Sequence, residues 1–500
     1  MRAPDSGDYT VGVVGAGAMG QGVAQVAIQG GLRTLLVDAT PGAAAAGKEK
    51  IAGRLDRLVE KGRLGEEDAA AALDRLEAVD AIAALAPCDA VIEAVFEDLE
   101  VKRSVFRDVE AAVRPDCVIA SNTSSIPIAS IARACEKRDR VAGLHFFNPV
   151  PLMKLVEVIR AVETSDETVE ALTALGRRMT RTPVTVKDSP GFLVNMGGGA
   201  FSTEALRILH EGVATPAQID AVMRDCRHFR MGPFELMDLT GIDVNYPVRG
   251  IIYEGYVHDP RLRTAPPHQA KFEAGQFGRK TRQGWYAYED GKPVAPSPDH
   301  RTEAEPPAHV ALAEPDAALE AFCGGLGLTV GADDGACPIL AAPIGDDAAH
   351  TALATHADFR RLVCVDLSGD VSGRVVIMTA PGADPAARDA VAAAILAAGR
   401  KVTAIKDSPG FIAQRIAAMI CNLGCYMAEI GLATPADIDL AMKLGLNYPL
   451  GPMELGDDLG HSSCLRILER LQAITGEDRY RPTLWLRRRA ALGLPLDTPN

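Results

Sequence analysis

One segment of this chain occurs twice, and the repeat constrains the fold more than any other feature. The string KDSPGF begins at Lys187 and again at Lys406, 219 positions later. At the same offset, TPAQID is repeated as TPADID and MGPFEL as LGPMEL. Aligning residues 182–241 with 401–460 without a gap gives 20 identities in 60 positions. Shared Pro, Gly and Asp at fixed spacing indicate repeated helix starts and turns, so a duplicated helical domain is expected.

Length, composition and charge limit the class of protein. Five hundred residues suggest two to four domains, and 47% hydrophobic with 24% charged residues indicate a soluble globular chain. The net charge of −14 argues against binding to nucleic acid or to an acidic membrane, because both require a basic surface. The N-terminus has no apolar signal region, no apolar run reaches about 18 residues, and the ten cysteines lack metal-ligand spacing. A reduced, cytoplasmic protein without a metal is expected.

Residues 9–38 have the pattern of a nucleotide-binding strand, turn and helix. An apolar run leads into GAGAMG, a helical stretch follows, and a second apolar run ends at Asp38. The three glycines permit a tight turn, backbone approach to a pyrophosphate, and close helix–strand packing. Asp38 can accept a hydrogen bond from a ribose 2′-hydroxyl and would repel a 2′-phosphate, which favours NAD over NADP. The predicted cofactor loop consists of Gly15, Ala16, Gly17, Ala18, Met19 and Gly20.

Strand-like runs at 89–95, 117–121 and 141–147 alternate with helical stretches such as 99–113. This alternation predicts a parallel, doubly wound sheet whose ligands lie outside the carboxyl ends of its strands. Four polar residues fall at or just after such ends and are therefore candidate site residues: Glu97, Asn122, Ser124 and His145.

His145 ends one apolar run, a Pro-containing turn follows, and Glu157 lies on the returning run. A hairpin of this kind can place the carboxylate beside the imidazole, where it would orient the ring and stabilise the imidazolium. Oxidation of a secondary alcohol with NAD requires such a base. A purely structural His–Glu pair is equally compatible with the spacing.

Residues 9 to about 288 resemble the 3-hydroxyacyl-CoA dehydrogenase family of fatty acid β-oxidation. The matching strings are GAGAMG, VIEAVFEDLEVK, SNTSS, GLHFFNPV, KLVEV, KDSPGFLVN and MGPFELMDLTG, in this order. The resemblance implies that His145 is the general base, that Glu157 is its partner, and that Ser124 and Asn195 hydrogen-bond the substrate oxygen. Asn195 is expected to come from the helical domain, so that closure of the two domains assembles the site. For NAD the resemblance points to Asp38, Glu97, Lys102, Asn122, Asn148 and Lys280.

The second copy keeps the repeated structural residues but lacks the candidate catalytic residues and the glycine motif. At the offset of the repeat, His145 corresponds to Cys364, Glu157 to Val376 and Asn195 to Gln414, and no GxGxxG opens the second half. Only the first copy is expected to be catalytic. The resemblance implies that helical domains of single-copy relatives pair between subunits, and we expect the second helical domain here to pair with the first inside one chain.

These patterns predict an α/β chain with a Rossmann-type doubly wound sheet and an all-α domain, followed by a degenerate second copy of both. The boundaries are 1–188 for the NAD-binding domain and 189–288 for the helical domain. A Pro-rich linker at 289–308, a degenerate sheet domain at 309–405 and a second helical domain at 406–500 complete the chain.

The acyl-CoA substrate is less well defined by the sequence. The duplicated 500-residue layout resembles the phenylacetate-degradation branch, whose substrate is 3-hydroxyadipyl-CoA, and 3-hydroxybutyryl-CoA is the other candidate. No cation could be assigned to the far carboxylate of an adipyl group. Met196 follows Asn195 where many relatives carry Arg, and the glycines at 197–199 indicate either close helix packing or space for the acyl chain.

The helix after Pro41 carries basic residues, of which Arg54 and Lys61 could meet CoA phosphates, although a solvated basic face explains them equally well. Two rival functions stay open: a non-catalytic, crystallin-like NAD-binding protein, and a β-hydroxyacid dehydrogenase with a lysine in place of the histidine base. The intact catalytic set argues against the first, and the HFFNP string with its Glu twelve residues after the His argues against the second. A homodimer is compatible with the sequence.

Overall fold

A computed structural model describes all 500 residues, which group into two compact units. The first unit contains residues 1–196 and 431–446, and the second contains 197–430 and 447–500. A short segment from the C-terminal part of the chain therefore belongs to the same unit as the N-terminal sheet.

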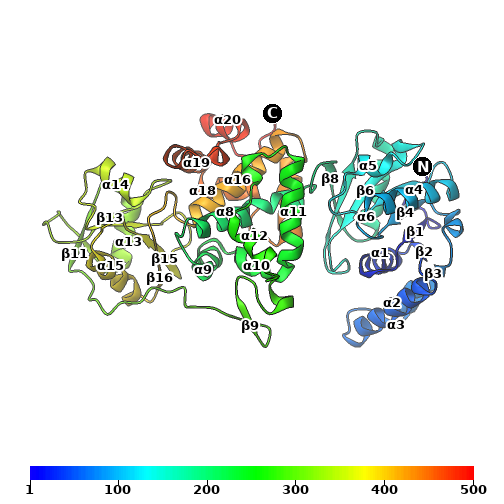
Figure 1. Cartoon of the computed structure of the whole chain (residues 1–500), viewed down its shortest axis with the longest axis horizontal. Helices are drawn as coiled ribbons and strands as arrows, with labels where there is room; N and C mark the ends of the chain where they lie inside the picture. The colour runs from blue at the N-terminus through cyan, green and yellow to red at the C-terminus, as the bar shows by residue number, and fades with distance from the viewer. The chain divides into compact units, whose positions relative to one another are not determined.

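The first unit is built on an eight-stranded sheet with the order β3-β2-β1-β4-β5-β6-β7-β8 (Figure 1). All neighbouring strands are parallel except the β6–β7 hairpin. Strand order reverses beside β1, where the predicted cofactor loop begins. The strands are β1 (Thr10–Val14), β2 (Arg33–Val37), β3 (Leu76–Val79), β4 (Ala90–Glu93), β5 (Val118–Ser121), β6 (Val141–Phe146), β7 (Leu155–Arg160) and β8 (Thr182–Lys187).

Helices cover both faces of this sheet, as the alternating pattern predicts. The β-branched and aliphatic residues of the central strands, such as Val11, Val13 and Ile92, are fully buried against them. The helices are α1 (Ala18–Gln29), α2 (Ala43–Glu60), α3 (Glu66–Asp74), α4 (Leu99–Ala112), α5 (Ile128–Ala132), α6 (Asp166–Arg178), α7 (Val194–Gly197) and, from the second half of the chain, α17 (Pro435–Leu446).

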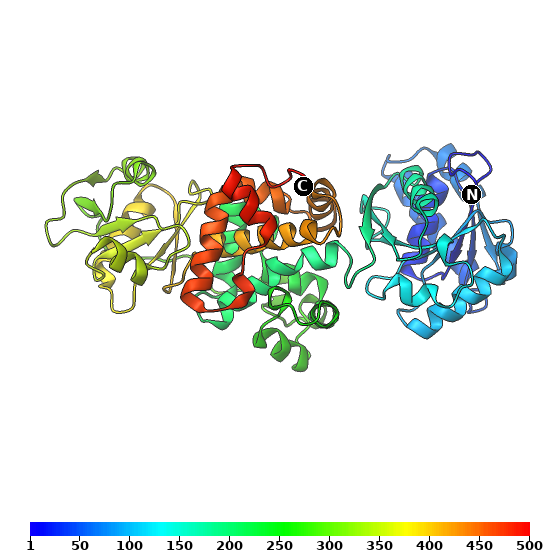
Figure 2. The same cartoon turned by 90° about the horizontal axis from the view of Figure 1, so that it is seen from above.

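The second unit contains a smaller sheet, drawn in yellow-green in Figure 2. Its six strands have the order β12-β11-β13-β14-β15-β16. Its β14–β15 pair is antiparallel and its other pairs are parallel, which repeats the pattern of the first sheet. Its elements are β11 (His309–Leu312), α13 (Ala317–Gly325), β12 (Thr329–Val330), β13 (Ile339–Ala341), α14 (Ala348–Thr355), β14 (Leu362–Val365), β15 (Arg374–Met378), α15 (Pro385–Ala397) and β16 (Lys401–Ile405).

The remaining elements of the second unit are helices from both copies of the repeat. The long apolar helix α16 is buried over nearly its whole length and packs beside α8. The helices of this group are α8 (Gly199–His210), α9 (Pro216–Arg227), α10 (Pro233–Thr240), α11 (Ile242–Gly255), α12 (Pro266–Glu273), α16 (Ala413–Glu429), α18 (Pro452–Leu459), α19 (His461–Thr475) and α20 (Leu484–Leu492). A hairpin of β9 (Ala287–Glu289) and β10 (Lys292–Val294) occupies the start of the predicted linker.

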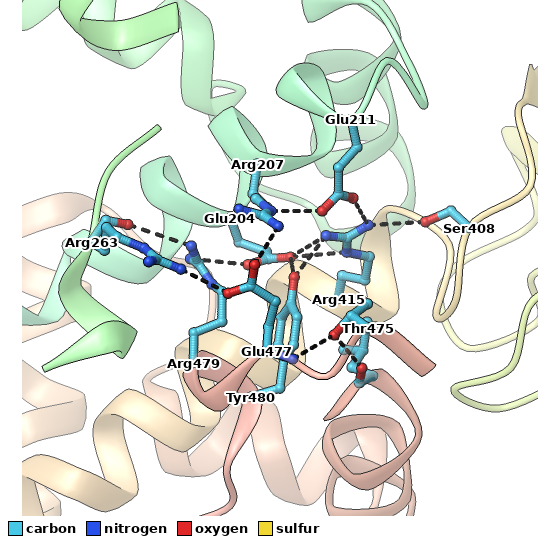
Figure 3. A network of polar contacts seen from close by, with 11 residues as sticks. Glu204, Arg207, Glu211, Arg263, Ser408, Arg415, Thr475, Glu477, Arg479 and Tyr480 are labelled. Carbon is cyan, nitrogen blue, oxygen red and sulfur yellow. Dashed lines mark hydrogen bonds and ion pairs between the residues drawn. The ribbon is translucent and has the colours of Figure 1, made fainter. Parts of the chain in front are cut away.

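Buried charges join α8 and α16 (Figure 3). Arg415 on α16 lies 2.7 Å from Glu204 on α8, and both side chains are fully buried. Arg415 also pairs with Glu211 at 2.7 Å, and the Tyr480 hydroxyl donates to Glu204 at 3.0 Å. Helices of the two copies therefore pair within one chain, as expected from the duplication.

The two copies also exchange a helix. In the first unit α17 contacts β7 and β8, and the Lys187 amide donates to the Leu432 carbonyl at 3.0 Å. In the second unit α9 contacts β15, and the Lys406 amide donates to the Val213 carbonyl at 3.1 Å. These bonds are equivalent at the offset of 219, so each sheet is covered by a helix from the other copy.

None of the helices is both long and apolar enough to span a lipid bilayer.

Candidate active site

The glycine loop has the geometry that its sequence predicts. Gly15 has a φ of +105°, and a Cβ there would lie 2.5 Å from the Ala94 carbonyl oxygen, while a Cβ at Gly20 would overlap the carbonyl of Gly15. At Gly17 a Cβ would meet nothing within 4 Å. The loop thus packs tightly at its first and third glycines and leaves open space at its second, where a pyrophosphate would need it.

The first turn of α1 and the Asp38 side chain lie beside the glycine loop. Gly17 caps α1 without a side-chain hydrogen bond, so the first amides of the helix stay available to an anion. The Asp38 carboxylate follows β2 and accepts from the Ala16 amide at 2.7 Å and the Thr40 amide at 2.9 Å. These bonds hold the carboxylate beside the loop, so the residues present fit a bound NAD.

His145 and Glu157 face each other across the antiparallel β6–β7 pair, in direct register. Nδ1 of His145 lies 2.6 Å from Oε2 of Glu157, and both residues are buried. The other carboxylate oxygen accepts from the amides of Leu193 and Val194 at 3.1 and 2.9 Å. Because the Nδ1 proton is directed at the carboxylate, Nε2 carries the free lone pair of the ring.

Ser124 and Asn195 meet in the first unit. The Asn195 amide donates to the Ser124 carbonyl oxygen at 3.2 Å. Asn195 lies on α7, whose first amides are those that bind Glu157, so one carboxylate positions both the imidazole and this helix. Asn195 groups with the sheet in the first unit and contacts Ser124 there, and assembly of the site by domain closure stays a prediction.

Glu97 organises the loop after β5. Its Oε1 accepts from the Thr123 hydroxyl at 2.6 Å and from the amides of Ser124 and Ser125 at 2.9 and 3.1 Å. Burial raises the pKa of this carboxyl, but the hydrogen bond from Thr123 and the charge of Lys102 outweigh it and leave the pKa below its ordinary value. The charged carboxylate thus fixes the loop that carries Ser124.

Three further predicted cofactor residues have contacts or positions within the first unit. Lys102 is 1% exposed and its ammonium pairs with Glu93 at 2.7 Å and Glu97 at 3.3 Å. The Asn122 side chain accepts from the Phe146 amide at 2.8 Å and so pins the end of β6 next to His145. Asn148 is exposed in the turn after β6. Through these contacts Lys102 and Asn122 hold neighbouring parts of the candidate site in position.

Of the remaining predicted residues, Arg54 and Lys61 belong to the first unit and Lys280 to the second. Arg54 reaches the Gln21 side chain at 2.5 Å, and Lys61 is exposed at the end of α2. Lys280 belongs to the second unit, where it pairs with Asp243.

Sequence reasoning missed two groups. Glu93, at the end of β4, is fully buried and binds both Lys102 and the Ser121 hydroxyl, at 2.7 and 2.6 Å. Its position at the end of a predicted strand was the sequence feature that could have identified it. In the second sheet domain, ligand atoms of His309, Asp334 and Cys337 lie within 4.8 Å of one another and could hold a metal ion. Their wide sequence spacing gave no sign of this group.

The structure also corrects the residue matching of the second copy. In the β14–β15 pair Cys364 faces Met378, and the Asp366 amide donates to the Val376 carbonyl. The residue opposite Val376 is therefore Asp366, and the prediction that Cys364 matches His145 is wrong. The second hairpin is shorter by two residues, which shifts the register. Asp366 accepts from Gln414 at 3.0 Å, so this position holds no imidazole base.

Comparisons with known proteins agree with this geometry. Residues 10–189 match the family model "3-hydroxyacyl-CoA dehydrogenase, NAD binding domain". Residues 191–288 and 410–495 match "3-hydroxyacyl-CoA dehydrogenase, C-terminal domain". The duplication of the helical domain is thus seen by an independent comparison.

Similar proteins include full-length and single-copy members. The 3-hydroxyadipyl-CoA dehydrogenase of Escherichia coli is 38% identical over 486 residues, covering 97% of this chain and 98% of that protein. The 3-hydroxybutyryl-CoA dehydrogenase of Bradyrhizobium diazoefficiens is 40% identical over 57% of this chain and 97% of its own. A crystal structure of 3-hydroxybutyryl-CoA dehydrogenase from Escherichia coli K12 superposes with a TM-score of 0.86 at 35% identity, covering 97% and 98% of the two chains. The chain belongs to the 3-hydroxyacyl-CoA dehydrogenase family of NAD-dependent oxidoreductases.

Proposed function

We propose that the first copy oxidises the 3-hydroxyl group of an (S)-3-hydroxyacyl-CoA, with His145 as the general base and Glu157 as its partner. The observation that carries this proposal is the 2.6 Å contact between Nδ1 of His145 and Glu157. It leaves Nε2 to take the hydroxyl proton, while the buried carboxylate stabilises the imidazolium that forms. NAD, when bound, accepts the hydride that leaves C3.

Ser124 and Asn195 are proposed to hydrogen-bond the oxygen at C3. Their mutual contact supports the view that both can reach one small group, and the hydrogen bonds of Glu97 and Glu157 hold the two segments that carry them. Donors fixed in advance at the oxygen need no reorganisation when the carbonyl forms or, in the reverse direction, is reduced.

We propose 3-hydroxyadipyl-CoA as the physiological substrate, with 3-hydroxybutyryl-CoA as the second candidate. The support is similarity: the full-length relative named for 3-hydroxyadipyl-CoA shares the duplicated layout over nearly its whole length. Single-copy relatives named for 3-hydroxybutyryl-CoA match only the first half, although one full-length structure carries that name too and keeps it as the second candidate. We further propose five domains, with boundaries after residues 188, 288, 308 and 405. We also propose a role in phenylacetate degradation and assembly as a homodimer. The ten unpaired cysteines are in keeping with a cytoplasmic location, which we propose as well.

Formation of NADH by the purified full-length protein tests this function. The protein receives NAD with (S)-3-hydroxybutyryl-CoA or with 3-hydroxyadipyl-CoA, beside a His145→Ala variant, and NAD binding is measured separately by calorimetry. Turnover that the variant loses while still binding NAD supports the proposal. No turnover with either substrate, despite NAD binding, would favour the non-catalytic NAD-binding protein.

A further inference from the structure

A histidine, an aspartate and a cysteine converge in the second sheet. His309 is the first residue of β11, and Asp334 and Cys337 lie in the loop that joins β12 to β13. One ligand atom from each of the three residues lies within 4.8 Å of the other two. Nε2 of His309 is 3.5 Å from Oδ2 of Asp334. The three side chains therefore offer a nitrogen, an oxygen and a sulfur to one small volume, all within the second unit.

The backbone of the second sheet brings the histidine to this loop. His309 pairs with Thr329 across the parallel β11–β12 ladder, and the Gly331 amide donates to the Val310 carbonyl at 2.9 Å. A Cβ at Gly331 would lie 3.4 Å from Cδ2 of His309, so the imidazole lies against the first residue of the loop. The loop thus starts beside the ring.

The two carboxylate oxygens of Asp334 have different partners. Oδ1 accepts from the amides of Ala336 and Cys337 at 2.9 and 2.8 Å, which closes a tight turn. Oδ2 is the atom that faces His309. One oxygen therefore shapes the turn that carries the cysteine, and the other is placed to bind a cation as a single ligand.

The neighbouring charges leave Asp334 to act as a ligand. Arg361 binds both oxygens of Asp333, at 2.6 and 2.9 Å, and also pairs with Asp358 at 3.1 Å. Two other carboxylates therefore neutralise this guanidinium. Arg361 also donates to the Cys337 carbonyl at 2.8 Å, which holds the backbone of the cysteine in place.

The mixture of donor atoms selects the kind of metal. Imidazole nitrogen, thiolate sulfur and carboxylate oxygen are ligands of Zn²⁺, whereas Mg²⁺ and Ca²⁺ prefer oxygen alone. Around a tetrahedral zinc, with bonds of about 2.0–2.3 Å, ligand atoms lie about 3.3–3.8 Å apart. The distance from His309 to Asp334 already meets this value, and the remaining ligand distances need a closure of about 1 Å at most. A simple His–Asp ion pair would account for two of the three residues and not for the thiol beside them.

We propose that His309, Asp334 and Cys337 bind one divalent cation of the zinc class, with water in the fourth position. The Cys337 thiol releases its proton to solvent when the metal binds. Cys337 is buried, whereas the Asp334 side chain is 48% exposed, so the ion enters from the solvent side. The ion ties β11 to the loop before β13 and stabilises the folded sheet. This inference is independent of the proposed function, whose catalytic residues belong to the first unit.

Cobalt substitution tests the site in the full-length protein. The protein is stripped with a chelator, kept reduced and titrated with Co²⁺, whose bond to a thiolate gives an ultraviolet charge-transfer absorption. Zn²⁺ is then added to displace Co²⁺, and the melting temperature is measured with and without Zn²⁺. We expect one equivalent of Co²⁺ per chain, displacement by Zn²⁺ with a Kd below about 1 µM, and a higher melting temperature with Zn²⁺.

Three variants identify the ligands. Cys337→Ser should abolish the charge-transfer absorption, because it removes the sulfur. His309→Gln and Asp334→Asn should each weaken Zn²⁺ binding at least about tenfold. Asp334→Asn keeps an oxygen that can accept from the two amides, so it changes the ligand while preserving the turn.

Two matched controls, His300→Gln and Cys323→Ser, should bind both metals like the wild type. His300 forms a similar pair with Asp389 at 2.9 Å outside this group of ligands, and Cys323 is a buried thiol of α13. Circular dichroism of each metal-free variant verifies that it is folded. The metal site would be overturned by a wild type without the charge-transfer absorption, by an absorption that survives Cys337→Ser, or by equal Zn²⁺ affinities of His309→Gln and His300→Gln.

Discussion

The two KDSPGF segments share a backbone, whereas the residues that come after each of them differ. In both, the Asp accepts from two amides at the start of a helix: Asp188 from Ile128 and Ala129, Asp407 from Ala348 and Ala349. In both, the Phe has a positive φ, 50° and 51°. The scaffold of the duplication is therefore kept to the level of single hydrogen bonds.

Two residues shortly after these segments separate the copies. Asn195 and Met196 in the first copy correspond to Gln414 and Arg415 in the second. Gln414 is buried and bound to Asp366, whereas Asn195 is partly exposed beside Ser124. In the second copy Gln414 and Arg415 are both buried in polar contacts, whereas in the first copy Asn195 stays partly exposed and Met196 is apolar.

Removing the second copy should have the largest effect. Without residues 300–500 the chain loses α16, which buries the apolar face of α8, and α17, which covers β7 and β8. We expect an insoluble or inactive protein, measured as soluble yield and NADH formation after expression. A soluble, active truncation would show that the second copy does not supply the pairing surface.

His145→Ala should lower kcat by about 10²- to 10⁴-fold, because it removes the proton acceptor. Asp366→Ala, at the equivalent position of the second sheet, is the matched control and should leave turnover near wild type. Steady-state kinetics with 3-hydroxyadipyl-CoA measure both. Comparable losses in the two variants would contradict the view that only one copy is catalytic.

Arg415→Met should lower the free energy of unfolding by about 3–5 kcal/mol, because it removes one of the two buried arginines that pair with the Glu204 carboxylate. At the offset of the repeat, Arg415 corresponds to Met196 and Glu204 to Leu423, so both positions have apolar counterparts. The double variant Arg415→Met with Glu204→Leu should therefore recover part of the loss, because it removes the buried carboxylate but also the ion-pair partner of Arg479. Urea denaturation of both single variants and the double variant measures the coupling, and simple additivity would argue against a direct buried pair.

Asp38→Asn should weaken NAD binding about ten- to a hundredfold, since a charged acceptor is lost at the ribose. The control is Asp316→Asn, which changes the cap of α13 after the first strand of the second sheet, where no glycine loop exists. Calorimetric titration with NAD gives both affinities. Weaker binding in the control would mean that the second copy also takes part in cofactor binding.

The smallest expected effect concerns stability in acid. Burial and the nearby charge of Arg249 lower the pKa of His268 to about 3, and its ring nitrogens are bound by Thr264 and Asn245. The folded state keeps this imidazole neutral while the unfolded chain protonates it near a pH of about 6.5. Above a pH of about 6.5 the neutral imidazole therefore takes nothing from the free energy of unfolding. Below it the free energy of unfolding falls as the pH decreases toward 3, by about 2 kcal/mol at pH 5.

His268→Gln should flatten this part of the pH profile, as measured by urea denaturation at pH 5 and pH 7. At the equivalent position the second copy has the partly exposed Arg487, so Arg487→Gln serves as the control and should leave the profile unchanged. A profile equally steep in His268→Gln would assign the acid sensitivity to other groups.

The sequence determined the local elements of the first copy and the geometry of its candidate site. Glycines at fixed spacing, apolar runs of strand length and a His twelve residues before a Glu are local patterns that favour a tight turn, strands and a hairpin. The loop at Gly15 to Gly20, the β6–β7 register and the His145–Glu157 contact arise from them.

Only the tertiary structure decided which distant residues meet. The exchange of α9 and α17, the match of His145 with Asp366, the pairing of Arg415 with Glu204 and the approach of Arg249 to Gly199 join residues 50 to more than 200 positions apart. Such contacts depend on how apolar faces are buried and how charges are paired in three dimensions, and sequence spacing carries no record of either. His309 shows the same: its residue type is visible in the sequence, whereas the carboxylate and the thiol beside it are visible only in the fold.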